Sequence, residues 1–237
     1  MKPPPVMPLF VFVLVLASGA ANGATIAYWN FNTLSMTAGV PSNALQTHYN
    51  PDAGAGSLDL VGWTYIGGAT APHGISNDVG NLLNAIGADP AGQALQLEGG
   101  TTVSNVTPNN GASLVLQCSM INQENPVVSF ATSRNGPAFK DNQISWSLDG
   151  VNYTNFGATY DPKVQWEIQS YDFSSVNALD SAALVYFRIM FTHATAGDSH
   201  NHIDNIQINA VTVVPEPSQL LLGALGAGFV LLSRRRS

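Results

Sequence analysis

The segment Ile144-Ser-Trp-Ser-Leu-Asp-Gly-Val-Asn-Tyr-Thr-Asn-Phe156 decides the fold class. Two runs within it, Ile144–Leu148 and Tyr153–Phe156, are predicted strands. The dipeptide Asp149-Gly150 lies between them, and its glycine can adopt the positive φ angle that tight hairpin turns require. The segment therefore predicts a β-hairpin.

Short apolar runs bounded by Gly, Pro or Asn continue on both sides of this hairpin. Further strands are expected at residues 25–31, 57–66, 93–98, 113–120, 127–132, 164–168, 171–175, 184–191 and 202–210, with one short helix at 79–86. The run at 184–191 is apolar on both faces apart from Arg188, which is typical of a central strand. This pattern predicts an all-β fold, a two-sheet antiparallel sandwich of jelly-roll type.

The C-terminal end carries three features in a fixed order. Val214-Pro-Glu-Pro-Ser218 is followed by an apolar run and then by Ser233-Arg-Arg-Arg-Ser237. The uncharged stretch 218–233 would span roughly 24 Å as a helix, less than the ~30 Å hydrocarbon core of a membrane. The arginines favour retention on the cytoplasmic side, so the rest of the chain is expected outside the inner membrane.

This order resembles the PEP-CTERM protein-sorting segment of Gram-negative bacteria. In that family the Pro-Glu-Pro motif, a short transmembrane helix and an Arg-rich end are recognised by exosortase, a membrane-embedded cysteine transpeptidase. The resemblance implies that exosortase is a partner and that the membrane anchor is transient. By position, the resemblance assigns recognition to Pro215, Glu216 and Pro217. It assigns the basic stop to Arg234, Arg235 and Arg236. The alternative is an ordinary C-terminal anchor that is never processed.

Three shorter phrases support the expected fold. Ser145–Gly150, Tyr186–Ile189 and Ile203–Ile206 are similar to phrases in the jelly-roll ectodomains of PEP-CTERM proteins and, more loosely, in carbohydrate-binding modules. This resemblance supports the expected fold and is not used to infer an activity.

The N-terminal end has the pattern of a secretory signal peptide. Lys2 precedes the apolar core Leu9–Leu16, and small residues follow up to Ala24. Cleavage is expected between Ala20 and Ala24, with the signal helix removed. The predicted organisation is therefore a signal peptide at 1–24, a β-sandwich ectodomain at 25–213 and a sorting segment at 214–237.

The ectodomain is acidic. Four of the eight basic residues but only one of the fifteen acidic residues lie in the two terminal segments, which leaves four basic and fourteen acidic residues in the sandwich. Nucleic acid and anionic lipid need a basic patch, so neither is an expected partner of the ectodomain. Cys118 is the only cysteine, and period two places it with Leu114, Leu116 and Met120; it is predicted to be a buried, inert thiol.

Two kinds of metal site are conceivable near the last strand. His200, His202 and Asp204 share one face of a strand, and His193 lies nearby, so imidazoles and a carboxylate could converge on a transition metal. The alternative is that Asp204 is a buried carboxylate satisfied by Arg188 or by backbone amides. Asp204 is also a candidate structural calcium ligand, with an oxygen of Asn30 or Asn32, if the first and last strands are neighbours.

Sugar binding requires an exposed aromatic platform beside amide and carboxylate groups. Alternation predicts that Trp29, Trp146 and Trp166 are core residues. Trp63 and Tyr65 are the candidate ligand-binding residues, and Tyr153 and Tyr160 near turns also remain available. No hydrolase elbow, zinc-protease helix or phosphate-binding loop occurs in the sequence, so no enzyme and no catalytic residue is expected.

Together these features predict an exported, non-enzymatic protein of the cell surface or extracellular matrix, sorted through its PEP-CTERM segment by exosortase. The alternative is a lectin-like, carbohydrate-binding module associated with extracellular polysaccharide. No cofactor is expected apart from the candidate calcium ion.

Overall fold

The computed structural model describes residues 23–33, 48–63, 66–68, 71–99 and 107–213. Residues 1–22 of the predicted signal peptide and the whole predicted sorting segment, with Pro215–Pro217 and Arg234–Arg236, lie outside the described residues, as does Tyr65. Among the described residues, no helix has the length and apolar character needed to cross a membrane.

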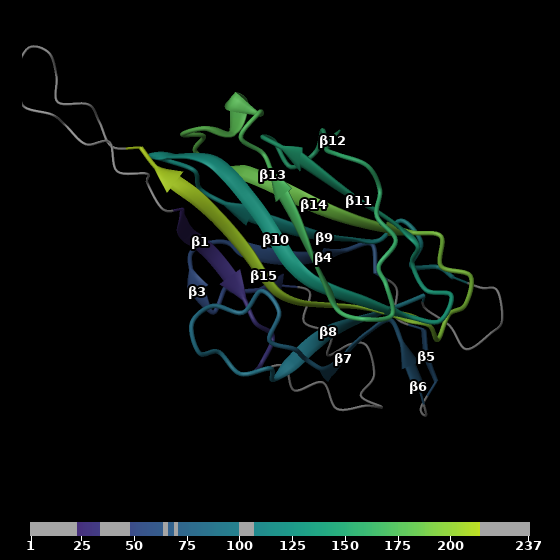
Figure 1. Ribbon diagram of the computed structural model, residues 1–237. Helices are drawn as coiled ribbons and strands as arrows, with labels where there is room; N and C mark the ends of the chain where they lie inside the picture. The colour runs from purple at the N-terminus through teal and green to yellow at the C-terminus, as the bar shows by residue number, and fades with distance from the viewer. Residues whose placement is uncertain (1–22, 34–47, 64–65, 69–70, 100–106, 214–237) are drawn as a thin grey trace, which may run out of the picture.

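Two antiparallel sheets pack face to face, which confirms the predicted two-sheet sandwich (Figure 1). Sheet A has the order β13-β10-β15-β1-β3, with β8 also paired to β15 and β7 paired to β8. Its strands are β1 (Ala24–Trp29), β3 (Ala53–Gly54), β7 (Ile75–Val79), β8 (Gln93–Glu98), β10 (Gln123–Asn135), β13 (Glu167–Asp172) and β15 (His200–Thr212).

Sheet B has the order β12-β11-β14-β9-β4-β2. Its strands are β2 (His48–Tyr49), β4 (Ser57–Val61), β9 (Ser113–Cys118), β11 (Asp141–Ser147), β12 (Thr154–Asn155) and β14 (Val185–Thr192). A separate two-stranded sheet consists of β5 (Ile66–Gly68) and β6 (Ala71–His73), and a 3-10 turn, η2, spans Asn177–Leu179.

The hairpin that was predicted first is present. β11 and β12 pair antiparallel, with Trp146 opposite Thr154. Gly150 has a φ angle of 72°, and the Asp149 carboxylate accepts hydrogen bonds from the backbone N–H groups of Val151 and Asn152. The hairpin and the positive φ of Gly150 are therefore as predicted, but the connection covers residues 148–153 and is not a two-residue primed turn.

The predicted central strand is also confirmed, since β14 lies between β11 and β9. It is buried on one face only, because Val185, Phe187, Ile189 and Phe191 point into the core and the residues between them are half-buried. Arg188 lies on the outer face, where its guanidinium sits 4.0 Å from the Tyr153 ring centre. Cation–π stacking thus accommodates the one charge in the strand.

Three local predictions are wrong. The strand expected at 57–66 ends at Val61 as β4, and Ile66 belongs to β5. Residues 79–86 form no helix: β7 ends at Val79 and turns follow. The strand expected at 164–168 begins only at Glu167, and it ends at Asp172, two residues into the strand expected at 171–175. β13 pairs only with β10 and is therefore an edge strand of sheet A. Ile168 lies on its exposed face and is 48% exposed, and Val164, which precedes the strand, is 68% exposed.

The core lies between the two sheets and includes the predicted members Trp29 and Cys118. Cys118 is buried together with Leu114, Leu116 and Met120, as the alternation predicted. Burial raises the pKa of the Cys118 thiol to about 12, so the thiol stays protonated and unreactive at neutral pH.

Candidate functional site

The long strand β15 changes its neighbour part-way along one edge. His200–Ile203 pair with β8, whereas Ile206–Ala210 pair with β1. Asp204 and Asn205 lie between these two stretches, and Asn205 has a positive φ angle of 50°. We call this place the junction, defined as Asp204 and Asn205 with the covering loop 80–92.

The loop 80–92 is attached to the junction by hydrogen bonds. The Asn205 side chain donates to the carbonyl oxygens of Asn81 and Leu83, both at 2.9 Å, and the Asn84 side chain donates to the carbonyl oxygen of Asn205. The loop thus satisfies the backbone carbonyl oxygen and the side-chain amide of Asn205. Gly80 permits the close approach, because a Cβ atom there would lie 2.0 Å from the Ala91 carbonyl oxygen and 2.8 Å from Asp204 Oδ2.

Asp204 is fully buried beneath this loop. Its Oδ2 accepts hydrogen bonds from the backbone and side-chain nitrogens of Asn81, and its Oδ1 accepts one from the Asn205 backbone. Burial raises the pKa of Asp204 to about 7, against the opposing effect of these N–H donors. The expected satisfaction by backbone amides is therefore found, whereas Arg188 lies in the other sheet and contacts Ser145.

The first and last strands are neighbours, as the calcium prediction required. The Asn30 side chain, however, donates to Asp89, and the Asn32 side chain bonds to Gln93 N and Pro90 O. Since both Asp204 oxygens are already engaged, a calcium ion bound there would have to replace existing hydrogen bonds. Calcium at Asp204 stays a prediction.

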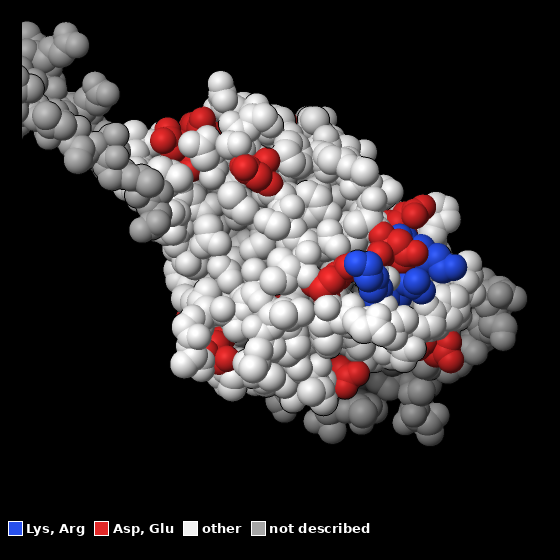
Figure 2. All heavy atoms as spheres, viewed as in Figure 1, with Lys and Arg blue, Asp and Glu red and all other residues white. Residues whose placement is uncertain are grey.

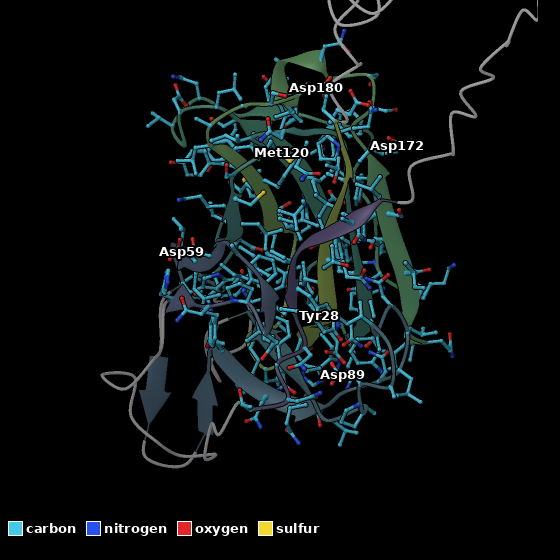
Figure 3. All side chains as sticks on the ribbon, turned by 90° about the vertical axis from the view of Figure 1, so that its left-hand side faces the viewer. Tyr28, Asp59, Asp89, Met120, Asp172 and Asp180 are labelled. Carbon is cyan, nitrogen blue, oxygen red and sulfur yellow. The ribbon has the colours of Figure 1, made fainter. Side chains whose placement is uncertain are left out.

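A pocket of about 360 Å³ opens beside the junction, between β1, β3 and the covering loop. Its apolar lining comes from Ala53, Ile86 and Ala88. Its polar lining comes from Tyr28, Asn30, Asp52 and Asp89. Figure 3 shows Tyr28 and Asp89 together at one end of the sandwich, far from Asp172 and Asp180 at the other.

Hydrogen bonds fix the polar groups of this pocket. Asp89 Oδ2 accepts from the Tyr28 hydroxyl at 2.8 Å and from the Asn30 side chain at 2.7 Å, and Asp52 Oδ2 accepts from the Asn30 backbone. The Tyr28 hydroxyl also lies 2.7 Å from the side-chain oxygen of Asn205. Burial first, and then the bond to Asp89, raise the pKa of Tyr28 well above its usual value, so its proton is retained. Neither Asp52 nor Asp89 accepts a hydrogen bond at Oδ1 from the described part of the chain, and these oxygens remain as acceptors for a ligand.

On the other side of the junction, two histidines of β15 meet a carboxylate of β7. Asp78, His200 and His202 each offer one ligand atom, and these atoms lie within 4.8 Å of one another. Burial lowers the pKa of both imidazoles, although Asp78 opposes the shift. The predicted cluster is thus partly wrong: His193 pairs with Asp141 at 2.7 Å, and the carboxylate beside His200 and His202 is Asp78. Asp78 is 124 residues from His202, so no sequence spacing indicated it.

The aromatic residues also differ from expectation. Trp166 is half-buried, not a core residue, and its ring lies 5.5 Å from that of His202. Trp146 is half-buried and packs against the edge of the core. Trp63, predicted as an exposed platform, is half-buried against Phe139 and Phe191, and its indole N–H donates to the Ser113 carbonyl oxygen. These contacts hold Trp63 against the core, and Tyr65 lies outside the described residues.

The described basic residues form no continuous positive surface. Arg134 pairs with Asp161 at 2.9 Å and Lys163 pairs with Glu167 at 2.7 Å. Figure 2 shows the basic side chains of that face gathered at one end and interleaved with acidic ones.

No family model and no curated protein matches this chain. Among solved structures, the chain is similar to the N-terminal CBM22-1–CBM22-2 tandem domain of Paenibacillus barcinonensis Xyn10C, with 19% identity, a TM-score of 0.44, and coverage of 84% of this chain and 50% of the other. A structure described as CBM4 has 12% identity and a TM-score of 0.42, and covers 76% of this chain and 98% of the other. The K1 cleaved adhesin domain of Lys-gingipain from Porphyromonas gingivalis W83 has 13% identity and a TM-score of 0.38, with coverage of 76% and 95%. At these identities and TM-scores, no ligand or activity is carried over to this chain.

Proposed function

We propose that this protein is an exported, non-catalytic β-sandwich of jelly-roll type that binds a neutral extracellular polysaccharide in the pocket beside the junction. The observation that carries the proposal is the pocket itself, in which two carboxylates and an amide are held in fixed orientations around a small apolar surface. Pre-oriented polar groups with an apolar wall are the usual composition of a small-molecule site.

The chemistry of the pocket suits a sugar. Sugar hydroxyl groups can donate hydrogen bonds to the Oδ1 atoms of Asp52 and Asp89, and the C–H faces of a sugar ring can pack against Ile86 and Ala88. A pocket of about 360 Å³ accommodates one or two sugar rings. None of the lining residues is basic, so an anionic polysaccharide would be repelled.

The proposal includes the route of export. β1 begins at Ala24, at the end of the predicted signal peptide, and β15 ends at Thr212, just before the predicted sorting segment. The sandwich thus lies between the predicted signal peptide and the predicted sorting segment. Exosortase recognises Pro215–Pro217, with the inner membrane as a transient anchor, and the mature sandwich is released to the cell surface or the extracellular polymer.

The binding part is tested with the full chain on an array of neutral and anionic glycans. We expect retention of neutral glycans, and weaker retention by an Asp52→Asn/Asp89→Asn variant, in which each side chain keeps one acceptor oxygen and replaces the other by an NH2 group. Asp172→Asn is the matched control, because this carboxylate lies at the far end of the sandwich (Figure 3). Equal binding by the double variant and the control would reject the pocket as the binding site.

The sorting part is tested by mass spectrometry of the C-terminus of the exported protein from its host. We expect mature chains that lack Arg234–Arg236, and accumulation of the full-length precursor when Glu216 is replaced by alanine. Mature exported protein with an intact Arg-rich end would reject processing and would leave an ordinary membrane anchor.

A further inference from the structure

We propose that Asp78, His200 and His202 form a binding site for a divalent transition-metal ion, of which Zn²⁺ is the best-suited example. This site goes beyond the proposed polysaccharide binding and does not depend on it. Two imidazoles with one carboxylate are a ligand set typical of zinc, and also of copper and nickel.

The distances are close to those of a metal site. The ligand atoms around a tetrahedral zinc ion, with bonds of about 2.0–2.2 Å, lie roughly 3.3 Å apart. His202 Nε2 and Asp78 Oδ2 are already 3.1 Å apart, and the ligand atom of His200 lies within 4.8 Å of both. Asp78 is exposed and His200 half-buried, so small side-chain rotations can bring the three atoms onto one ion.

The strand arrangement places these side chains on the outer face of sheet A. His200 and His202 are two residues apart on β15, so they project from the same face. Their rings have centroids 4.6 Å apart. β8 separates β15 from β7, and Gln96 of β8 is opposite both His202 and Ser76. Asp78 therefore reaches His202 across an intervening strand, which is a contact that sheet pairing alone does not produce.

A neighbouring side chain orients the central ligand. The Ser133 hydroxyl lies 3.0 Å from Nδ1 of His202, and it thereby engages the ring nitrogen that faces away from Asp78. Ligating histidines usually have their second nitrogen held in this way, which fixes the direction of the metal-binding lone pair. The ring of Trp166 lies against His202 and restricts its rotation. Ser133 is thus a positioning residue.

The surroundings favour a cation. Glu98 is opposite His200 in the strand pairing, and Asp198 lies just before β15. Three protein ligands would leave one tetrahedral position of zinc open to water or to a small ligand.

The test uses the full chain, purified in detergent through a tag that contains no histidine, and titrated with Zn²⁺ in a calorimeter. We expect one Zn²⁺ per chain, and Co²⁺ in the same site should give the visible absorption bands of a tetrahedral ion. His200→Gln and Asp78→Asn should lower the affinity at least 10-fold, and Ser133→Ala should lower it about 10–100-fold while the stoichiometry is kept.

His193→Gln is the matched control, because His193 also lies 2.7 Å from a carboxylate, that of Asp141, and is outside the cluster. It should bind Zn²⁺ as the unchanged chain does. Circular dichroism of each variant checks folding. Absence of Zn²⁺ binding by the folded chain would overturn the proposal, as would binding that His193→Gln lowers as much as His200→Gln. The metal titrations do not involve glycan, so a negative result would not affect the proposal that the pocket binds a polysaccharide.

Discussion

β14 and β15 are interior strands of their respective sheets, yet they are built differently. Along β14, buried and half-buried residues alternate without interruption between two continuous neighbours, β11 and β9. β15 is buried at four successive positions, Ile203–Ile206, where its neighbour changes from β8 to β1. Regular alternation produces a core strand. Where the neighbour changes, polar groups of the strand form hydrogen bonds with other segments. The proposed sugar pocket and the proposed metal site both lie beside this junction.

The largest effect is expected from the core face of β14. Phe187 is fully buried between the sheets, so Phe187→Ala should lower the free energy of unfolding by about 3–5 kcal/mol. Tyr186→Ala, on the half-buried face of the same strand, should cost clearly less. Urea unfolding of the two variants measures the difference. Equal losses would contradict the assignment of one buried face to β14.

A smaller loss is expected at the junction. Asp204→Ala removes the acceptor for the backbone N–H groups of Asn81 and Asn205 and for the Asn81 side chain. It should lower the free energy of unfolding by about 2–3 kcal/mol. Asp172→Ala, on the exposed edge strand β13, serves as the control. Hydrogen exchange should show faster exchange of the Asn81 and Asn205 amides in Asp204→Ala. Unchanged protection there would mean that Asp204 does not attach the loop.

The smallest effect is expected at the edge strand. Ile168 is 48% exposed, so Ile168→Thr should change the free energy of unfolding by no more than about 0.5 kcal/mol. Ile189→Thr in β14 is the matched change at a fully buried position and should cost far more. A large loss for Ile168→Thr would restore the core role that strand alternation predicted for residues 164–168.

The sequence predicted those parts of the fold that depend on local patterns. The Asp149-Gly150 turn, the β14 strand and the buried side of β9 each follow from a glycine position or from alternation over a few residues. Alternation could not predict which strand lies at an edge, because that depends on partners distant in the chain. Alternation therefore predicts a core position for Trp166, although this residue directly precedes β13, which has a neighbour on one side only.

The candidate sites were predicted only in part, for the same reason. His200 and His202 share a strand, so their proximity follows from spacing. Asp78 joins them only through the non-local pairing of β7, β8 and β15. Asp89 likewise reaches Tyr28 from a loop 61 residues away, and nothing in the sequence around Asp89 distinguishes it from a solvated loop carboxylate.

The most direct test of the central claim is a calorimetric titration of the full chain with the neutral oligosaccharide that a glycan array selects. Ala88 lines the pocket, and Ala88→Phe would fill it without removing a hydrogen bond described above. Ala158→Phe makes the same change at an exposed position between β12 and β13 that does not line the pocket. Binding by the unchanged chain and by Ala158→Phe, with loss of binding in Ala88→Phe, is the predicted result. Undiminished binding by a folded Ala88→Phe variant would contradict the assignment of the pocket.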